Sequence, residues 1–164
     1  MLHFAPEPFL VKHFKNNNYL TYVTADLNPV FASTKVDITD INFSNDYFDF
    51  ILCLHVLEHI PDDGKAIREL YRVCKPGGLA FIQVPVDINR SETFEDPSVV
   101  NEEDRRRVFG QFDHVRICGL NYHERLKKAG FNVEVINYSE RFSQEDLLKF
   151  GFLSREDFYL CKKV

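Results

Sequence analysis

The sequence predicts a single α/β domain built on an open, mostly parallel sheet with helices on both faces. Segments rich in β-formers alternate with segments of helical periodicity. Residues 48–54 and 79–84 are almost wholly apolar, as strands buried on both faces of a sheet must be. The chain has 164 residues, close to the roughly 150 of one domain. We therefore expect residues 1–164 to form one unit.

The first half of the chain is expected to contain four strands and one helix. The strands are predicted at residues 1–4, 19–24, 34–36 and 48–54. Pro8 suits the first turn of the helix, because proline lacks the N–H that this turn leaves unpaired. Three apolar side chains are expected to form the buried face of that helix: Phe9, Leu10 and Phe14.

The second half is expected to contain three helices and three strands. Asp62 or Asp63 opens a helix whose apolar residues recur with a 3.6-residue period, and KPGG at residues 75–78 ends it. Asn121 and Glu124 resemble a capping box for the next helix, and Ser143 caps the last one. The strands are predicted at residues 79–84, 131–138 and 158–162.

Residues 87–112 interrupt this alternation. They are polar, and three acidic residues at 102–104 precede three arginines at 105–107. Acids followed by bases suit the dipole of a solvated surface helix. A long polar insert after a strand also suits a lid over a ligand. Both interpretations stay open at this stage.

Composition and charge narrow the class of protein. Hydrophobic residues make up 45% of the chain, and 20 basic against 25 acidic side chains give a net charge of −5. We expect no nucleic-acid partner at this charge. No segment has the features of a membrane span or a signal peptide, so we expect no membrane partner and a cytoplasmic location. The cysteines form no C-x-x-C pair and are expected to be reduced core residues: Cys53, Cys74, Cys118 and Cys161.

A ligand of an open parallel sheet binds outside the carboxyl ends of its strands. Asp26 ends the second predicted strand, about 20 residues after the first, where an acid can accept both hydroxyls of a ribose. A simple turn aspartate explains this position equally well.

Three motifs then resemble one family. They are FDFI at 48–51 followed by HVLEHIPD at 55–62, LYRVCKPGG at 70–78, and AGF at 129–131. In this order and spacing they resemble class I S-adenosylmethionine-dependent methyltransferases, and most closely their small-molecule type 11 group. The resemblance implies a Rossmann-like methyltransferase sheet, mostly parallel with an antiparallel last strand. It also implies S-adenosylmethionine as cofactor and S-adenosylhomocysteine as product.

The resemblance assigns cofactor-binding roles to several residues. Asp26 would bind the ribose, and Asp37 and Ile38 would bind the adenine, with Asp37 accepting from its exocyclic amine. His55 and Val56 would line the methionine end. An apolar slot with few polar contacts is what an adenine requires.

The first loop departs from the family. The family's G-x-G-x-G loop is replaced by HFAPEP at residues 3–8, and two prolines remove amide donors. This run resembles the first loop of a variant of the family. The resemblance implies that Glu7 would contact the cofactor's amino group. The chain also begins at the first strand, so we expect a homodimer partner to cover apolar surface there.

Two histidine motifs remain. His114 is the general-base candidate, because histidine titrates near neutral pH, although a structural histidine is an alternative. His55, Glu58 and His59 match the H-x-x-E-H pattern of a group of zinc peptidases. They follow a strand and no long helix carries them, so we expect packing and capping there and no metal.

The sequence thus predicts methyl transfer from S-adenosylmethionine to a small-molecule acceptor. The alternative is a catalytically inactive protein of the same fold that binds a ligand or partner. A nicotinamide-binding enzyme would need its own glycine fingerprint, which is absent.

Overall fold

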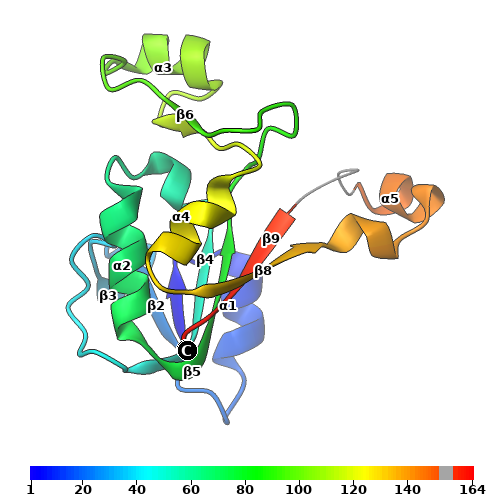
Figure 1. Ribbon diagram of the computed structural model, residues 1–164. Coiled ribbons are helices and arrows are strands. Elements are labelled where there is room, and N and C mark those ends of the chain that lie inside the picture. The colour runs from blue at the N-terminus through cyan, green and yellow to red at the C-terminus, as the bar shows by residue number, and fades with distance from the viewer. Residues whose placement is uncertain (152–156) are drawn as a thin grey trace.

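A seven-stranded sheet forms the centre of the molecule (Figure 1). The computed structural model describes residues 1–151 and 157–164. Across the sheet the strand order is β3-β2-β1-β4-β5-β9-β8. The strands are β1 (Leu2–Phe4), β2 (Val23–Asp26), β3 (Thr34–Lys35), β4 (Phe48–Leu54), β5 (Cys74–Gln83), β8 (Asn132–Asn137) and β9 (Asp157–Lys162).

The direction of the strands confirms the predicted sheet. β1 pairs in parallel with β2 and β4, and β4 pairs in parallel with β5. Among the described strands of this sheet, β9 alone runs antiparallel, inserted between β5 and β8. The chain order therefore reverses between β1 and β4, which makes that pair the switch point of the sheet.

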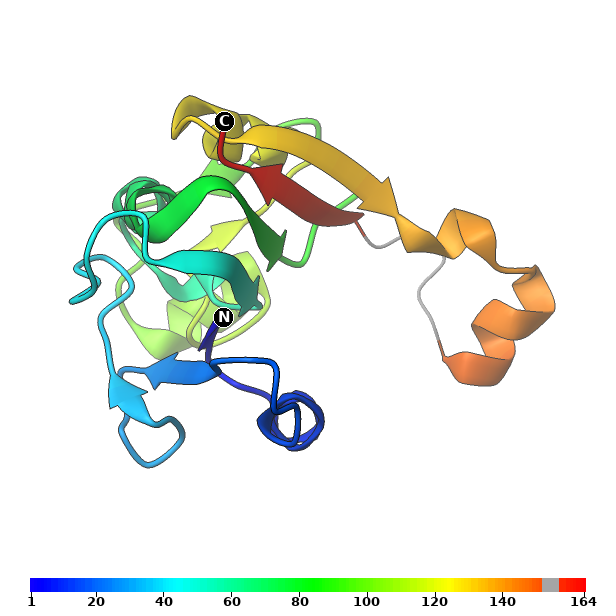
Figure 2. The ribbon, with the colours of Figure 1, turned by 90° about the horizontal axis from the view of Figure 1, so that it is seen from below.

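Helices lie on both faces of the sheet, as Figure 2 shows most clearly. On one side lie α2 (Asp63–Val73) and α4 (Tyr122–Lys128), and on the other lies α1 (Pro8–Lys15). The core between α2, α4 and the sheet contains fully buried aliphatic and aromatic side chains, among them Ile67, Leu70, Leu126 and Tyr159. All four cysteines are buried free thiols, as predicted.

Two expectations for the first half are wrong. No residue of α1 is buried, and the side chain of Phe9 is 79% exposed. Leu10 and Phe14 are only half-buried, although the Phe14 ring lies 5.7 Å from that of Tyr22. The strand expected at residues 19–24 begins only at Val23, because residues 16–19 form a turn after α1 and residues 20–22 are irregular.

Two helix boundaries also differ from the prediction. α2 ends at Val73, and the KPGG segment lies inside β5, where Cys74 pairs with Phe48. Pro76 cannot continue a helix but tolerates the irregular pairing at this strand's start. The predicted capping box of α4 does not form, because the Asn121 side chain accepts instead from the Thr93 N–H at 2.9 Å.

The insert at 87–112 folds over the carboxyl ends of the parallel strands (Figure 1). It contains β6 (Phe94–Glu95) and the predicted surface helix, α3 (Glu102–Phe109). β6 pairs with β7 (Arg116–Ile117) in a two-stranded antiparallel ribbon that the sequence did not predict. The remaining elements are α5 (Gln144–Phe150) and two 3₁₀ turns, η1 (Leu57–His59) and η2 (Tyr138–Arg141).

Candidate functional site

The switch point between β1 and β4 is marked by two unusual backbone conformations. Ala5 directly follows β1 with φ of 45°, and His55 directly follows β4 with φ of 52°. Residues other than glycine rarely adopt a positive φ. Such residues are concentrated at functional sites, where the surrounding structure holds the strained backbone in place. The Ala5 N–H donates to the Ala25 carbonyl at 2.9 Å, and the His55 N–H donates to the Gln83 carbonyl at 3.1 Å. Hydrogen bonds to the neighbouring strands therefore hold both turns.

An apolar cavity of about 100 Å³ opens at these strand ends. Its lining residues are Phe4, Ala5, Ala25, Asp26, Leu27, Val36, Ile38, Val56 and Ile60. A groove of about 530 Å³ adjoins it, with Ala5 and Asp26 lining both spaces. The structure thus brings three of the predicted cofactor residues to one cavity: Asp26, Ile38 and Val56.

The two predicted carboxylates near this cavity differ in setting. Asp26 lies at the boundary of cavity and groove, and its Oδ1 accepts from the Asn28 N–H at 2.7 Å. Asp37 is exposed and lies in sequence between two lining residues. The backbone N–H and the hydroxyl of Thr39, each at 2.8 Å, lower the pKa of Asp37 and fix the rotation of its carboxylate.

Glu7 belongs to a hydrogen-bonded chain that begins inside the sheet. Its Oε2 accepts from Nε2 of the fully buried His3 at 2.7 Å, and the Tyr22 hydroxyl lies 2.6 Å from His3 Nδ1. Burial lowers the pKa of His3, against the hydrogen bond and charge of Glu7. Burial and the charge of Glu7 together raise the pKa of Tyr22 to about 12. The proline-containing loop therefore has a side-chain anchor where the family has glycines.

Four further side chains meet beyond the end of β4. His55 is half exposed, and its Nδ1 lies 3.4 Å from Oε1 of the buried Glu58. Nε2 of His59 lies 3.8 Å from the same oxygen, and the rings of His59 and His114 meet edge to face at 4.9 Å. Burial, followed by the neighbouring His59, lowers the pKa of His114. His114, predicted separately from the H-x-x-E-H run, therefore lies against it.

The predicted capping role of Glu58 and His59 is wrong. The cap of α2 is Asp62, which accepts from the Lys65 N–H at 2.8 Å. Glu58 and His59 lie in η1, one turn before the helix. Their packing against His114 required the insert to return to this loop, which short-range sequence pattern does not reveal.

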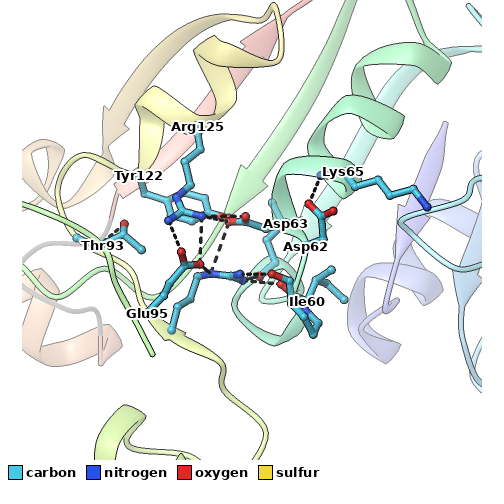
Figure 3. Close-up of polar contacts among 12 residues, drawn as sticks. Ile60, Asp62, Asp63, Lys65, Thr93, Glu95, Tyr122 and Arg125 are labelled. Carbon is cyan, nitrogen blue, oxygen red and sulfur yellow. Dashed lines mark hydrogen bonds and ion pairs between the residues drawn. The ribbon is translucent and has the colours of Figure 1, made fainter. Parts of the chain in front are cut away.

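The insert is fixed at its base by a partly buried ionic network (Figure 3). Arg116 is 1% exposed, and its guanidinium donates to Glu95 Oε1 at 2.7 Å. Arg125 bridges the Glu95 carboxylate and Asp63, each at 2.9 Å. Tyr122 donates its hydroxyl to Asp63 at 3.0 Å. The ribbon of the insert is therefore tied to α2 and α4.

The same arginine holds the loop that follows β4. Arg116 also donates to the carbonyls of Leu57, Ile60 and Pro61, with the last two at 2.8 and 3.0 Å. Arg116 lies only two residues beyond His114. Its neighbours in the sequence are apolar, and they gave no indication that Arg116 would bind these carbonyls. It thus links the insert to the loop that supplies Val56 and Ile60 to the cavity.

This strand order and the strand-end site define a class I methyltransferase fold. Residues 10–82 match the family model described as a methyltransferase domain, in the type 11 group. This matched segment contains two of the three sequence motifs, those at residues 48–62 and 70–78. In the described part of the chain, no helix is both long and apolar enough to cross a membrane.

Solved structures extend the likeness to nearly the whole chain. A methyltransferase from Mesorhizobium loti, titled as S-adenosylmethionine dependent, has a TM-score of 0.66 at 13% identity and covers 98% of this chain and 88% of its own. Haemonchus contortus phosphoethanolamine N-methyltransferase 2, solved with S-adenosylmethionine, has a TM-score of 0.65 at 19% identity, over 99% and 48%. The [4+2]-cyclase SpnF reaches 0.67 at 15% identity, over 99% and 74%. The TM-scores establish the fold, and at such low identity they establish the fold alone.

Curated relatives match a shorter segment. The ubiquinone biosynthesis O-methyltransferase of Pseudomonas putida strain W619 is 50% identical over 44 residues, which are 27% of this chain. The enzyme of Pseudomonas paraeruginosa is 46% identical over the same length. The match spans only 18% of the length of these relatives.

Proposed function

We propose that this domain binds S-adenosylmethionine at the switch point and transfers its methyl group to a small molecule. The observation that carries the proposal is the cavity between β1, β2 and β4, with Asp26 at its border. Its apolar walls suit an adenine, and the adjoining groove gives the space that the rest of a cofactor requires.

Each part of the cofactor can be assigned to residues at this site. Asp26 would accept from the ribose hydroxyls, as an acid at the end of the second strand can. Ile38 would pack on the adenine, and Asp37 would accept from its amine. His55 and Val56 would lie along the methionine portion. Glu7 would share its carboxylate between His3 and the cofactor's amino group.

When bound, S-adenosylmethionine supplies an electrophilic methyl group on a sulfonium. His55 and Val56, along the methionine portion, would hold this methyl group toward an acceptor that supplies a lone pair. The protein aligns the two reactants and excludes water. His114, whose pKa is lowered by its burial and then by His59, would take the proton that an acceptor hydroxyl or amine loses.

The test is transfer of an isotopically labelled methyl group from S-adenosylmethionine to acceptors grouped by nucleophile: phenols, carboxylates, amines and activated carbons. We expect label in one group, with kcat reduced in His114→Asn and unchanged in the control His13→Asn, which alters an exposed histidine on α1. Cofactor binding without transfer to any group would favour the alternative, an inactive binding protein.

The proposal includes the cellular location and the oligomeric state of the protein. The buried thiols and the absence of a membrane span in the described residues support a cytoplasmic location. A homodimer is supported by α5, which projects from the sheet (Figure 2) and exposes Leu148 by 84% and Phe150 by 56%. Sedimentation equilibrium would give the mass of a dimer, and a monomer mass at high concentration would refute it.

A further inference from the structure

Glu58, His59 and His114 form a cluster of metal-ligand type beside the cavity. One ligand atom from each residue lies within 4.8 Å of the others. Two of these residues come from η1, and the third comes from the segment that leads into β7. The loop that carries Glu58 and His59 also supplies Val56 and Ile60 to the cavity.

The carboxylate of this cluster lacks a partner for one oxygen. Glu58 is 1% exposed, and its Oε2 has no hydrogen-bond partner among residues 1–151 and 157–164. Buried carboxylates are normally paired, hydrogen-bonded or bound to a metal, because burying an unpaired charge is costly. The geometry thus calls for a positive group facing Glu58.

His59 is oriented as a metal ligand is. Its Nδ1 lies 3.3 Å from the Asp113 carbonyl and 3.4 Å from Asp113 Oδ2. Its Nε2 faces Glu58 Oε1. Metal-binding histidines usually donate one ring N–H to a carbonyl or carboxylate, which fixes the ring and leaves the other nitrogen for the ion.

The backbone around the cluster is held in place. The Val115 N–H donates to the Glu58 carbonyl at 3.0 Å, which joins the two segments that carry the ligands. Arg116 holds the carbonyls of Leu57 and Ile60 on either side. The three side chains therefore come together before any ion binds, as a preorganised site requires.

We propose that Glu58, His59 and His114 bind a divalent transition-metal ion such as Zn²⁺. Two imidazoles and one carboxylate make up a known donor set for zinc and related ions, and they leave coordination positions open for water or a substrate. This set replaces the peptidase interpretation, because His114 completes it and no long helix carries it. The binding claim does not rest on the proposed function. An ion bound to His114 would occupy the ring nitrogen that accepts a proton in the proposed methyl transfer.

The first experiment is a calorimetric titration with Zn²⁺ of the untagged protein, freed of metal with a chelator and without S-adenosylmethionine. We expect one ion per chain. Glu58→Gln and His114→Asn should abolish binding, and Asp113→Asn should weaken it by about 10- to 100-fold. The control His13→Asn should bind as the unaltered protein does.

Co²⁺ supplies a second readout of the same site. Visible absorption should appear with one Co²⁺ per chain, and Zn²⁺ should displace it. Circular dichroism of each variant separates lost binding from lost folding. No binding by the unaltered protein would overturn the proposal. So would equal binding by a folded Glu58→Gln variant. Neither result bears on methyl transfer, which is assayed separately with chelator present.

Discussion

Arg116 offers the sharpest test of how the insert and the site loop are held together. Its guanidinium donates to one carboxylate, that of Glu95, and to three backbone carbonyls, and it is 1% exposed. Arg116→Met keeps much of the apolar volume and removes every one of these donors. Glu95 would keep Arg125 as its remaining partner.

The expected loss follows from burial. The buried carboxylate near Arg116 is that of Asp63, whose side chain is 5% exposed and whose Oδ2 lies 3.6 Å from Arg116 Nε. Removing one partner of such a buried pair costs about 3–5 kcal/mol, because the groups left behind stay buried and lose their partner. Glu95, with 36% of its side chain exposed, adds little to this loss. That is a large part of the 5–15 kcal/mol or so by which domains are stable. At roughly 2–4 °C per kcal/mol for a domain of this size, Tm should fall by roughly 6–20 °C.

The assay is urea unfolding followed by circular dichroism, with a matched surface variant. Arg107 also donates to a carboxylate, Asp104 at 2.6 Å, but its side chain is 78% exposed. Arg107→Met should therefore cost about 0–1 kcal/mol. If Arg116→Met costs no more than Arg107→Met, the buried network does not hold the insert and our reasoning fails.

Two further predictions concern the buried His3 and a comparison of Gly119 with Gly64. Burial lowers the pKa of His3 below its ordinary 6.5, so the unfolded chain binds more protons than the folded chain as pH falls below that value. The contribution of His3 to the free energy of unfolding is therefore fully present above pH 6.5 and is lost as pH falls. Tm should therefore drop more steeply from about pH 7 to about pH 5 in the unaltered protein than in His3→Gln; parallel curves would contradict this. A Cβ on Gly119 would lie 2.4 Å from the backbone carbon of Glu92, so Gly119→Ala should cost about 1–3 kcal/mol in urea unfolding. Gly64 in α2 meets only side-chain atoms at 3.4 Å and beyond, so Gly64→Ala should stabilise by roughly 0.5–1 kcal/mol, and equal effects of the two changes would refute the steric argument.

The strands of the sheet could be predicted because their signals are local. β4 has the predicted bounds and is apolar except at Asp49, and β9 differs from its prediction by one residue. The family motifs then supplied the strand order and the antiparallel β9, which periodicity alone does not determine. Strand-end positions such as Asp26 follow from the same logic.

Long-range contacts could not be predicted in this way. The insert returns to the loop after β4, and this return brings His114 to Glu58 and Arg116 to the carbonyl of Leu57. Each residue by itself looks like an isolated polar side chain in a short segment. The failure at α1 has the opposite cause, since Phe9 has the right period for burial but is exposed. Periodicity shows that a helix has an apolar face, but it does not show what covers that face.

The measurement that tests the central claim most directly is calorimetric titration with S-adenosylhomocysteine of the unaltered protein and of Asp26→Asn. We predict one site per chain with Kd on the order of micromolar, about −8 kcal/mol, and a clearly weaker site in Asp26→Asn. The control Asp40→Asn, outside the cavity lining, should bind as the unaltered protein does. No heat at about millimolar ligand, or equal affinity in Asp26→Asn, would contradict the account.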